Sequence, residues 1–368
     1  MNKKNSFREA PEKYWNLESL RDAPSWRLSG FPDSHWEGLQ DILFDGVPVD
    51  GVKSPVFAYV GKPGGPAPVG GFPGIVLIHG GGGTAFPEYI QLWISYGYAV
   101  IAIDWYNRRP VIRNLEQGGE EQLNQVELPG GTRRNHLANV SNMVLAHSLL
   151  RRLPDVNPDR IGFVGLSWGS WYGAMVAAVD SRFKFVLEIY CGDCNPESED
   201  FINGRFLHAA KVPMYWIAST NDHNVTPESL QRGFEECSSL WNKSLVVDLP
   251  HSHVGFTFPV CRRVADCFLR NGTPLPVLGK PHLESGILSA GILSAGNGIH
   301  NAVLCYTADR MENTTWKRVW HKVPADISEN RISTRVPEDA TQAFLSAYDA
   351  ESPFDDCCGS TDLVILKK

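Results

Sequence analysis

The sequence predicts a doubly wound, mostly parallel α/β sheet followed by a small all-β sandwich domain. The first observation is alternation, because buried apolar strands such as 74–78 and 99–104 are separated by an expected helix at 87–96. The second is a short apolar strand that ends in a glycine-flanked turn and is followed by a helix of small residues at 171–178. The third is a change of pattern after residue 272, where strands are separated by turn signals rather than by helices.

These patterns divide the chain into four parts. We expect an N-terminal extension over 1–50, an α/β catalytic domain over 51–272, a linker over 273–298 and a β-sandwich domain over 299–368. The extension is turn-rich and is expected to pack on the main domain. Further elements follow from apolar periodicity: an antiparallel edge hairpin at 45–60, helices at 136–153, 227–240 and 259–271, and strands at 183–190, 212–219, 243–249, 302–307, 316–320, 331–336 and 342–348.

Composition limits the classes of partner. The 368 residues are 43% hydrophobic and 20% charged with a net charge of −7, which is typical of a globular protein. Mild acidity without a basic stripe argues against nucleic acid, and no apolar run approaches the eighteen or so residues that span a bilayer. The basic N-terminal start has no apolar core after it, so no secretion signal is indicated and a cytoplasmic location is expected.

The eight cysteines do not form a pattern that indicates a site. Cys191 and Cys194 make a C-x-x-C motif, and Cys357 and Cys358 are adjacent, but neither pair has a second pair at zinc spacing. We therefore expect reduced thiols, with no metal and no cofactor.

The segment Gly165-Leu-Ser-Trp-Gly169 is the feature around which the chain is organised. A serine on a sharp strand-to-helix turn is the nucleophile elbow pattern, and glycines on both sides allow strand and helix backbones to approach closely. Ser167 is the candidate nucleophile. The motif alone is weak, and its flanking strand and helix are what favour it over an ordinary turn.

A serine nucleophile needs a base and an orienting carboxylate, which follow it in the order acid then histidine in folds of this kind. Asp222 comes just after the expected strand 214–219, and His253 just after the strand 245–249. His251 is the competing base, and Asp248 is the competing acid, although it falls inside that last expected strand. We expect Asp222 and His253, with His251 as a possible pocket residue.

The glycine run at 79–83 has two interpretations. As an oxyanion loop, its backbone N–H groups would act with the amide of Trp168; the candidate residues are Gly80, Gly81 and Gly82. As a dinucleotide fingerprint, it would read Gly80-x-Gly82-x-x-Ala85, with Asp104 after the next strand. The fingerprint needs a helix that begins near Gly82, and Pro87 would then interrupt that helix. The oxyanion interpretation is therefore favoured.

Aromatic residues follow the strand ends. Trp105 and Tyr106 come directly after the strand at 99–104, so they are expected to line an acyl or sugar pocket unless they only pack the core.

The segments 79–86, 165–169 and 250–253 resemble the acetyl xylan esterase branch of the dienelactone-hydrolase-like α/β-hydrolases. The resemblance covers residues 70–272, and 300–350 is similar to a β domain appended to some of these esterases and to prolyl-oligopeptidase relatives. It implies removal of acetyl groups from carbohydrate esters, with an acetylated oligosaccharide or polysaccharide as substrate. Ser167, Asp222 and His253 match the triad of the group, although dienelactone hydrolases proper use cysteine as nucleophile.

Two other functions stay open from the sequence. One is a serine peptidase of the prolyl-oligopeptidase type, because a serine triad can cleave either bond. The other is a non-catalytic carbohydrate-binding protein on a hydrolase scaffold.

Overall fold

The computed structural model describes residues 7–112, 124–190, 192–310, 312, 314–349 and 358–366. The chain forms two compact units, one of residues 1–186 with 205–212 and the other of 187–204 with 213–368. The sequence-based boundaries at 50, 272 and 298 stay predictions, and each unit is described here by itself. Within the described residues, no helix has the length and apolar character needed to cross a bilayer.

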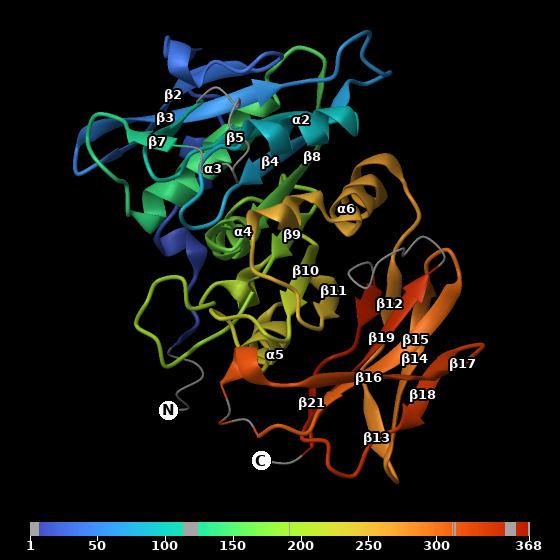
Figure 1. Ribbon diagram of the computed structural model, residues 1–368. Helices are drawn as coiled ribbons and strands as arrows, with labels where there is room; N and C mark the ends of the chain where they lie inside the picture. Colours follow the sequence, from blue (N-terminus) through green and yellow to red (C-terminus); the bar gives the residue numbers. More distant parts are fainter. Residues whose placement is uncertain are drawn as a thin grey trace. The chain divides into compact units, whose positions relative to one another are not determined.

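The first unit is built on a sheet whose strands have the order β1-β2-β3-β5-β4-β8 (Figure 1). Strands β4 and β5 are parallel, as are β4 and β8, whereas β1, β2 and β3 are joined by antiparallel pairs and β3 pairs antiparallel with β5. The strands are β1 (Trp26–Leu28), β2 (Gln40–Val49), β3 (Val52–Gly61), β4 (Phe72–Ile78), β5 (Ala99–Ile103) and β8 (Val156–Leu166), and the helices are α2 (Pro87–Ser95), α3 (His136–Leu150) and α4 (Trp168–Val179).

The register of the three parallel strands brings their carboxyl ends together. Ile78 of β4 lies opposite Ile103 of β5 and opposite Gly165 of β8. Because the three strands end at the same level, the segments that begin at His79, Asp104 and Ser167 share one edge of the sheet.

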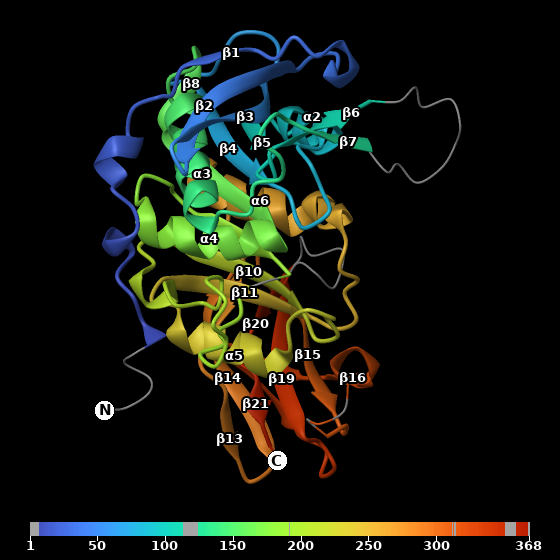
Figure 2. The same ribbon diagram turned by 90° about the vertical axis from the view of Figure 1, so that its left-hand side faces the viewer.

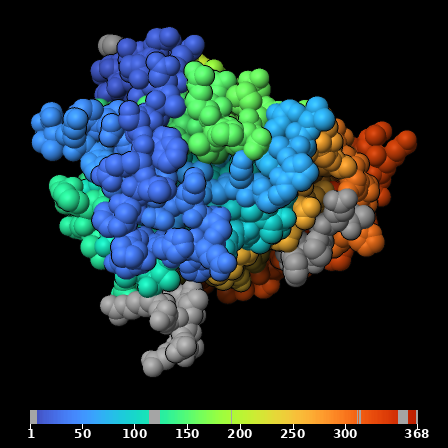
Figure 3. Space-filling view, turned by 90° about the horizontal axis from the view of Figure 1, so that it is seen from above, coloured from blue at the N-terminus to red at the C-terminus, as the bar shows by residue number. Residues whose placement is uncertain are grey.

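The N-terminal extension does more than pack on this sheet. It supplies β1 and the whole of β2. The edge strand is therefore β1, with Trp26 opposite Phe44 and Leu28 opposite Ile42, and the hairpin of β2 and β3 is not at the edge as expected. The blue N-terminal residues form a continuous strip over one face of this unit (Figure 3). A sequence pattern could not show this, because a three-residue strand with an entirely exposed face carries no alternation.

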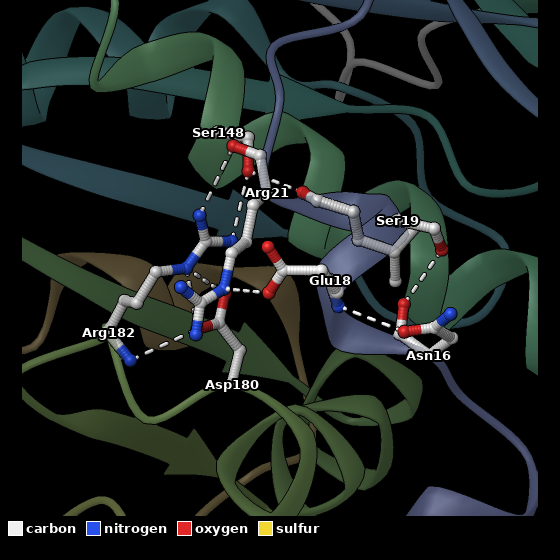
Figure 4. Close-up of polar contacts among 8 residues, drawn as sticks. Asn16, Glu18, Ser19, Arg21, Ser148, Asp180 and Arg182 are labelled. Carbon is white, nitrogen blue, oxygen red and sulfur yellow. Dashed lines mark hydrogen bonds and ion pairs between the residues drawn. The ribbon is translucent and has the colours of Figure 1, made fainter.

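A partly buried arginine and a buried serine tie the short helix η2 (Leu17–Leu20) to the body of the unit (Figure 4). Arg182 makes an ion pair with the fully buried Asp180 at 2.7 Å and donates to the Ser148 hydroxyl at 3.0 Å. The same hydroxyl donates to the carbonyl oxygen of Leu20 at 2.7 Å. This hydrogen bond fixes the extension to helix α3.

The described part of the segment 107–134 contains a small antiparallel pair of strands. These are β6 (Arg108–Val111) and β7 (Asn124–Glu127), with Arg108 opposite Glu127. Before Val212 the chain forms only a short 3-10 turn, η4 (Leu207–Ala209).

The second unit continues the α/β pattern and then changes to antiparallel sheets. Strand β9 (Val186–Ile189) is followed by the parallel pair β10 (Met214–Ser219) and β11 (Leu240–Val246). Helix α5 (Pro227–Glu236) separates β10 from β11, and a short turn η5 (His253–Thr257) leads into helix α6 (Pro259–Arg270). The expected helices at 227–240 and 259–271 are therefore present, the first shorter than predicted.

Two antiparallel sheets form the C-terminal part of this unit (Figure 2), as expected for a β sandwich. One has the order β12-β14-β18-β17 with β13 on β14, and the other β16-β15-β19-β20 with β21 on β19. Their apolar side chains share one core, which includes Leu288 and Ile332 from the first sheet and Leu304 and Leu345 from the second. The strands are β12 (Pro276–Leu278), β13 (His282–Glu284), β14 (Ile287–Ala295), β15 (Ile299–Thr307), β16 (Trp320–Pro324), β17 (Asp326–Ser328), β18 (Arg331–Arg335), β19 (Gln342–Asp349), β20 (Cys358–Ser360) and β21 (Val364–Ile365).

Two sequence expectations for this part differ from the structure. The stretch expected as a linker contributes β12, β13 and the nine-residue β14, which pairs with β18 over residues 287–291 and buries the three consecutive residues 288–290. The strand expected at 316–320 is wrong: residues 315–317 form the 3-10 turn η6 (Thr315–Lys317), and β16 begins at Trp320.

A buried carboxyl in β9 leads to a prediction about pH. Glu188 is fully buried, neither carboxyl oxygen has a hydrogen-bond partner among the described residues, and burial raises the pKa of this group well above 4.5. The folded protein therefore binds a proton that the unfolded chain releases above about pH 4.5, so folding stability falls as the pH rises above that value.

We expect Glu188→Gln to increase the free energy of unfolding at pH 8, and the gain to shrink toward pH 5. Urea denaturation at both pH values measures this, with the exposed Glu199→Gln as control. An effect of the same size at both pH values would contradict the prediction.

Candidate active site

The turn at Ser167 has the strained geometry that its motif predicts. Ser167 lies between β8 and α4 with φ of 55° and ψ of −116°, a conformation that side-chain-bearing residues rarely adopt. A Cβ on Gly165 would lie 2.3 Å from the Gly169 carbonyl oxygen, and a Cβ on Gly169 would lie 2.3 Å from the carbonyl oxygen of Ile78. Only glycine fits at either position, since real Cβ atoms do not approach backbone this closely.

Trp168 is the first residue of α4. The first N–H groups of a helix have no intrahelical acceptor, and they carry the positive end of the helix dipole. Next to a serine at the strand end, such amides are suited to stabilise an oxyanion.

The glycine loop reaches the same place from β4. The His79 Nδ1–H donates to the Gly80 carbonyl oxygen at 2.8 Å, so that carbonyl points toward the imidazole. Carbonyl and N–H of one peptide point in opposite directions, and the Gly81 N–H therefore points away from His79. A Cβ on Gly81 would lie 2.7 Å from Cδ1 of Trp168, which places this part of the loop against the residue that follows the serine.

Further hydrogen bonds hold the loop. Gln125 of β7 donates from Nε2 to the Gly82 carbonyl oxygen at 2.8 Å, and Arg108 donates from Nη1 to Oε1 of Gln125 at 3.1 Å. Burial raises the pKa of Tyr106, and a hydrogen bond with the Gly82 backbone opposes that shift. The loop conformation is thus fixed before any ligand binds, as electrostatic stabilisation of an oxyanion requires.

Burial sets the charge of the groups beneath the loop. It lowers the pKa of His79 to about 3, so the imidazole is neutral at ordinary pH and its single N–H is the one on Nδ1 that Gly80 accepts. Burial raises the pKa of Asp104, and the hydrogen bond from Thr84 opposes that rise. The Asp104 carboxyl accepts from the Thr84 hydroxyl at 2.7 Å and from the backbone N–H groups of Tyr106 and Arg108 at 2.9 and 3.1 Å.

The dinucleotide interpretation of the glycine run does not fit this geometry. Helix α2 begins at Pro87, five residues after Gly82, so the loop does not open a helix whose N-terminus holds a phosphate. Asp104, which that interpretation reserves for a ribose, is fully buried and bonded within the protein.

The aromatic residues that follow the strand ends differ in how deeply they are buried. Trp105 is buried, donates from Nε1 to the His79 carbonyl oxygen at 2.9 Å and stacks on Tyr106 with ring centroids 3.7 Å apart, so it supports the loop from below. Tyr106 and Trp168 are half-buried and keep exposed surface. His136 stacks on Trp168 at 5.9 Å and extends the same aromatic group.

The second unit contains an acid–base pair. Asp222 lies three residues after the end of β10, and its buried carboxylate accepts from the Asn224 N–H at 2.7 Å. His251 Nδ1 and Asp222 Oδ2 are 2.7 Å apart. Because the carboxylate accepts, Nδ1 carries the proton and Nε2 is left as the acceptor, which is the tautomer that a general base needs.

The choice between the two histidines changes in the light of this bond. The hydrogen bond to Asp222 is made by His251, which the sequence analysis ranked second, whereas His253 begins the η5 turn. The imidazole of His251 also stacks on Tyr190, with ring centroids 4.6 Å apart. The two histidines stand two residues apart in one loop, and the sequence carries no signal that separates them.

The expectation that Asp248 lies inside a strand is wrong. β11 ends at Val246, and Asp248 follows it with φ of 57°. It is therefore also beyond a strand end, and the sequence argument against it does not hold. Asp222 is preferred because of its bond to His251.

Several residues of the site were not found from the sequence. Tyr190 is the last residue of the expected strand 183–190, so its position at a strand end was a usable signal. Gln125, Thr84 and the bonds of Asp104 carry no local pattern, since they connect segments that meet only in the folded sheet.

The cysteine pairs are only partly described. Cys191 and Cys357 lie outside the described residues, and Cys194 is buried. Across the described part of the chain, no cluster of three or more His, Cys, Asp or Glu residues is arranged to hold a metal ion.

A parallel α/β sheet with a serine on a strained strand-to-helix turn is the arrangement found in α/β hydrolases. The dienelactone hydrolase family model matches residues 56–257, and the chain belongs to that family. No curated protein matches the chain in sequence.

The chain is similar to several solved structures. An acetyl xylan esterase from Paenibacillus sp. R4 superposes with a TM-score of 0.52 at 16% identity, covering 71% of this chain and 96% of that one. Acetyl xylan esterase 1 from Thermoanaerobacterium sp. JW/SL YS485 has a TM-score of 0.46 at 18% identity, covering 72% and 94%. A cold-adapted esterase from an Arctic intertidal metagenomic library has a TM-score of 0.45 at 24% identity, covering 67% and 99%.

The close contact at the nucleophile turn gives a prediction about stability. We expect Gly169→Ala to lower the free energy of unfolding by about 1–3 kcal/mol, because the new Cβ must push against the Ile78 carbonyl. Gly64→Ala is the matched control, since a Cβ there meets nothing within 4 Å. Chemical denaturation of both variants measures the difference. Equal stabilities for the two variants would show that the helix and strand are not packed as described.

Proposed function

We propose that the protein is a serine esterase in which Ser167, His251 and Asp222 act as one triad. The observation that carries the proposal is the hydrogen bond between His251 and Asp222, which fixes the tautomer that can accept a serine proton. The strained turn at Ser167 and the order serine, aspartate, histidine along the chain support it. His251 takes the place that the sequence analysis gave to His253.

The reaction follows from these groups. The Ser167 hydroxyl attacks the ester carbonyl while Nε2 of His251 accepts its proton, and the Nδ1–H stays bonded to Asp222. The N–H groups of Trp168 and Gly81 stabilise the negative charge on the tetrahedral oxygen. The imidazolium then gives its proton to the departing alcohol and leaves an acyl-serine. Water, deprotonated by the same imidazole, hydrolyses the acyl-serine to the acid and free serine.

We further propose that the substrate is a short acyl ester of a carbohydrate, most simply an acetylated xylo-oligosaccharide. This part rests on the resemblance of the motifs to acetyl xylan esterases and on the exposed surface of Tyr106 and Trp168 next to the nucleophile turn. The Paenibacillus protein that shares the fold carries the name acetyl xylan esterase, which is consistent with this choice.

Substitution of the triad tests the mechanism. Ser167→Ala and His251→Ala should each lower kcat for 4-nitrophenyl acetate by roughly 10³-fold or more, because triad residues act as a unit. His253→Ala, two residues away, should change it far less. A fluorophosphonate probe followed by peptide mass spectrometry should label Ser167 in the wild type. If His253→Ala is the inactive variant, the base is His253 and the triad proposal survives with that exchange; labelling at another serine would overturn it.

The substrate class is tested separately. We expect kcat/KM to fall steeply as the acyl chain of aryl esters lengthens beyond acetyl, because the proposal places the bulky side chain of Trp168 on the acyl side of the serine. Acetylated xylo-oligosaccharides should be deacetylated, and aminoacyl anilides should not be cleaved. Faster turnover of the anilides would favour a peptidase, and a preference for long acyl chains would favour a lipase-like enzyme. No turnover of any substrate by a correctly folded protein would favour a binding role.

A further inference from the structure

An exposed tryptophan from the C-terminal sandwich packs on the loop that carries the catalytic acid. Trp316 belongs to the turn η6, and its ring stacks on His223 with centroids 4.8 Å apart and planes 28° apart. His223 follows Asp222 directly in the sequence and is itself exposed. Trp316 is 47% exposed, so much of one of the largest apolar side chains is left in water beside the acid loop.

Two further contacts fasten η6 to that loop. The Asn221 side chain donates from Nδ2 to the carbonyl oxygen of Arg318 at 2.8 Å, so the residues on both sides of Asp222 touch the segment 316–318. The side chain of Arg318 is only 2% exposed, and its guanidinium pairs at 2.6 Å with Glu228, which lies in the first turn of α5. In Figure 1 the turn η6 is the short orange helix beside α5.

The segment is also held on its other side. The N–H of Val319 donates to the Asp309 carboxylate at 2.7 Å, and Gln342 of β19 donates to the same Glu228 carboxylate that Arg318 binds. A buried ion pair with additional hydrogen bonds specifies one geometry, because any arrangement that separates the two charged groups leaves a buried charge unpaired. These contacts therefore hold the segment that carries Trp316, and they fix the position of Trp316 relative to Asp222.

We propose that Trp316 is a sugar-binding residue that the C-terminal sandwich contributes to the active site. It packs a pyranose ring of the substrate against its exposed face. This inference rests on the proposed function and deepens it. The apolar C–H face of a pyranose ring is matched by a large flat aromatic surface, and a ring already stacked on His223 loses little conformational freedom on binding. The sandwich then has two roles: it holds the acid loop and it recognises the sugar.

The first experiment compares two substrates. We expect Trp316→Ala to lower the ratio of kcat/KM on acetylated xylo-oligosaccharide to kcat/KM on 4-nitrophenyl acetate about tenfold, mainly through KM. Trp316→Tyr, which keeps a stacking ring, should restore most of the ratio. A purely structural role for Trp316 would lower both rates together and leave the ratio unchanged, and this outcome would overturn the proposal.

The matched control is Trp26→Ala. Trp26 is 46% exposed and lies on β1 in the first unit, where it borders a cavity of about 420 Å³ near the amino end of β5. Its removal takes away the same amount of exposed indole without touching the acid loop. The ratio should stay at the wild-type value; an equal fall with Trp26→Ala would show that the effect is not specific to Trp316.

A binding experiment separates this proposal from the proposed catalysis. Calorimetry with unacetylated xylohexaose on Ser167→Ala needs no turnover, and the dissociation constant should rise about tenfold when Trp316→Ala is added. If xylohexaose binds and Trp316→Ala weakens it while no acetyl ester is cleaved by the wild type, the sugar site stands and the esterase proposal fails. If esters are cleaved but xylohexaose binds equally to both variants, or not at all, the role of Trp316 is overturned.

Discussion

The close approach of α4 to the end of β4 is the constraint on which the site depends. Gly169 lies against the Ile78 carbonyl, and Gly165 lies against Gly169, so the chain can pass from strand to helix only through a strained residue. That residue is Ser167, with φ of 55°. The same contact brings the first residue of α4 next to the glycine loop that leaves β4. One packing requirement therefore places both the nucleophile and the amides that would stabilise its oxyanion.

Buried polar groups then fix the loop at a single conformation. His79, kept neutral by burial, holds the Gly80 carbonyl, and Asp104 holds Thr84 and the backbone that follows β5. Gln125 holds the Gly82 carbonyl from a strand that is not adjacent in sequence. Such a network is costly when incomplete, because each unpaired member is a buried polar group. These hydrogen bonds hold the loop although Nε2 of the buried His79 has no hydrogen-bond partner among the described residues, and they are what makes a preorganised oxyanion site reasonable here.

Within the second unit, ion pairs join the C-terminal sandwich to the α/β part. Arg318 pairs with Glu228 beside the acid loop, and Arg263 of α6 makes a bidentate contact with Asp349 of β19 at 2.9 and 2.6 Å. Both arginines are largely buried, so these pairs fix the relative positions of their elements within the unit more than they add to stability. The sandwich is thereby coupled to the segment that carries Asp222 and is not an independent appendage.

The sequence by itself determined the parallel α/β pattern, the turn at Ser167 and the position of Asp222 at a strand end. These follow from local rules: apolar periodicity, glycine where backbones meet, and the placement of functional groups after strands. Only the tertiary structure decided that His251 bonds Asp222, that residues 276–295 form strands, and that Trp316 reaches the acid loop. Each of these depends on contacts between segments far apart in the chain or on side-chain direction within a loop. A one-dimensional pattern of residue types carries neither kind of information, because the partners become neighbours only after the sheets have formed.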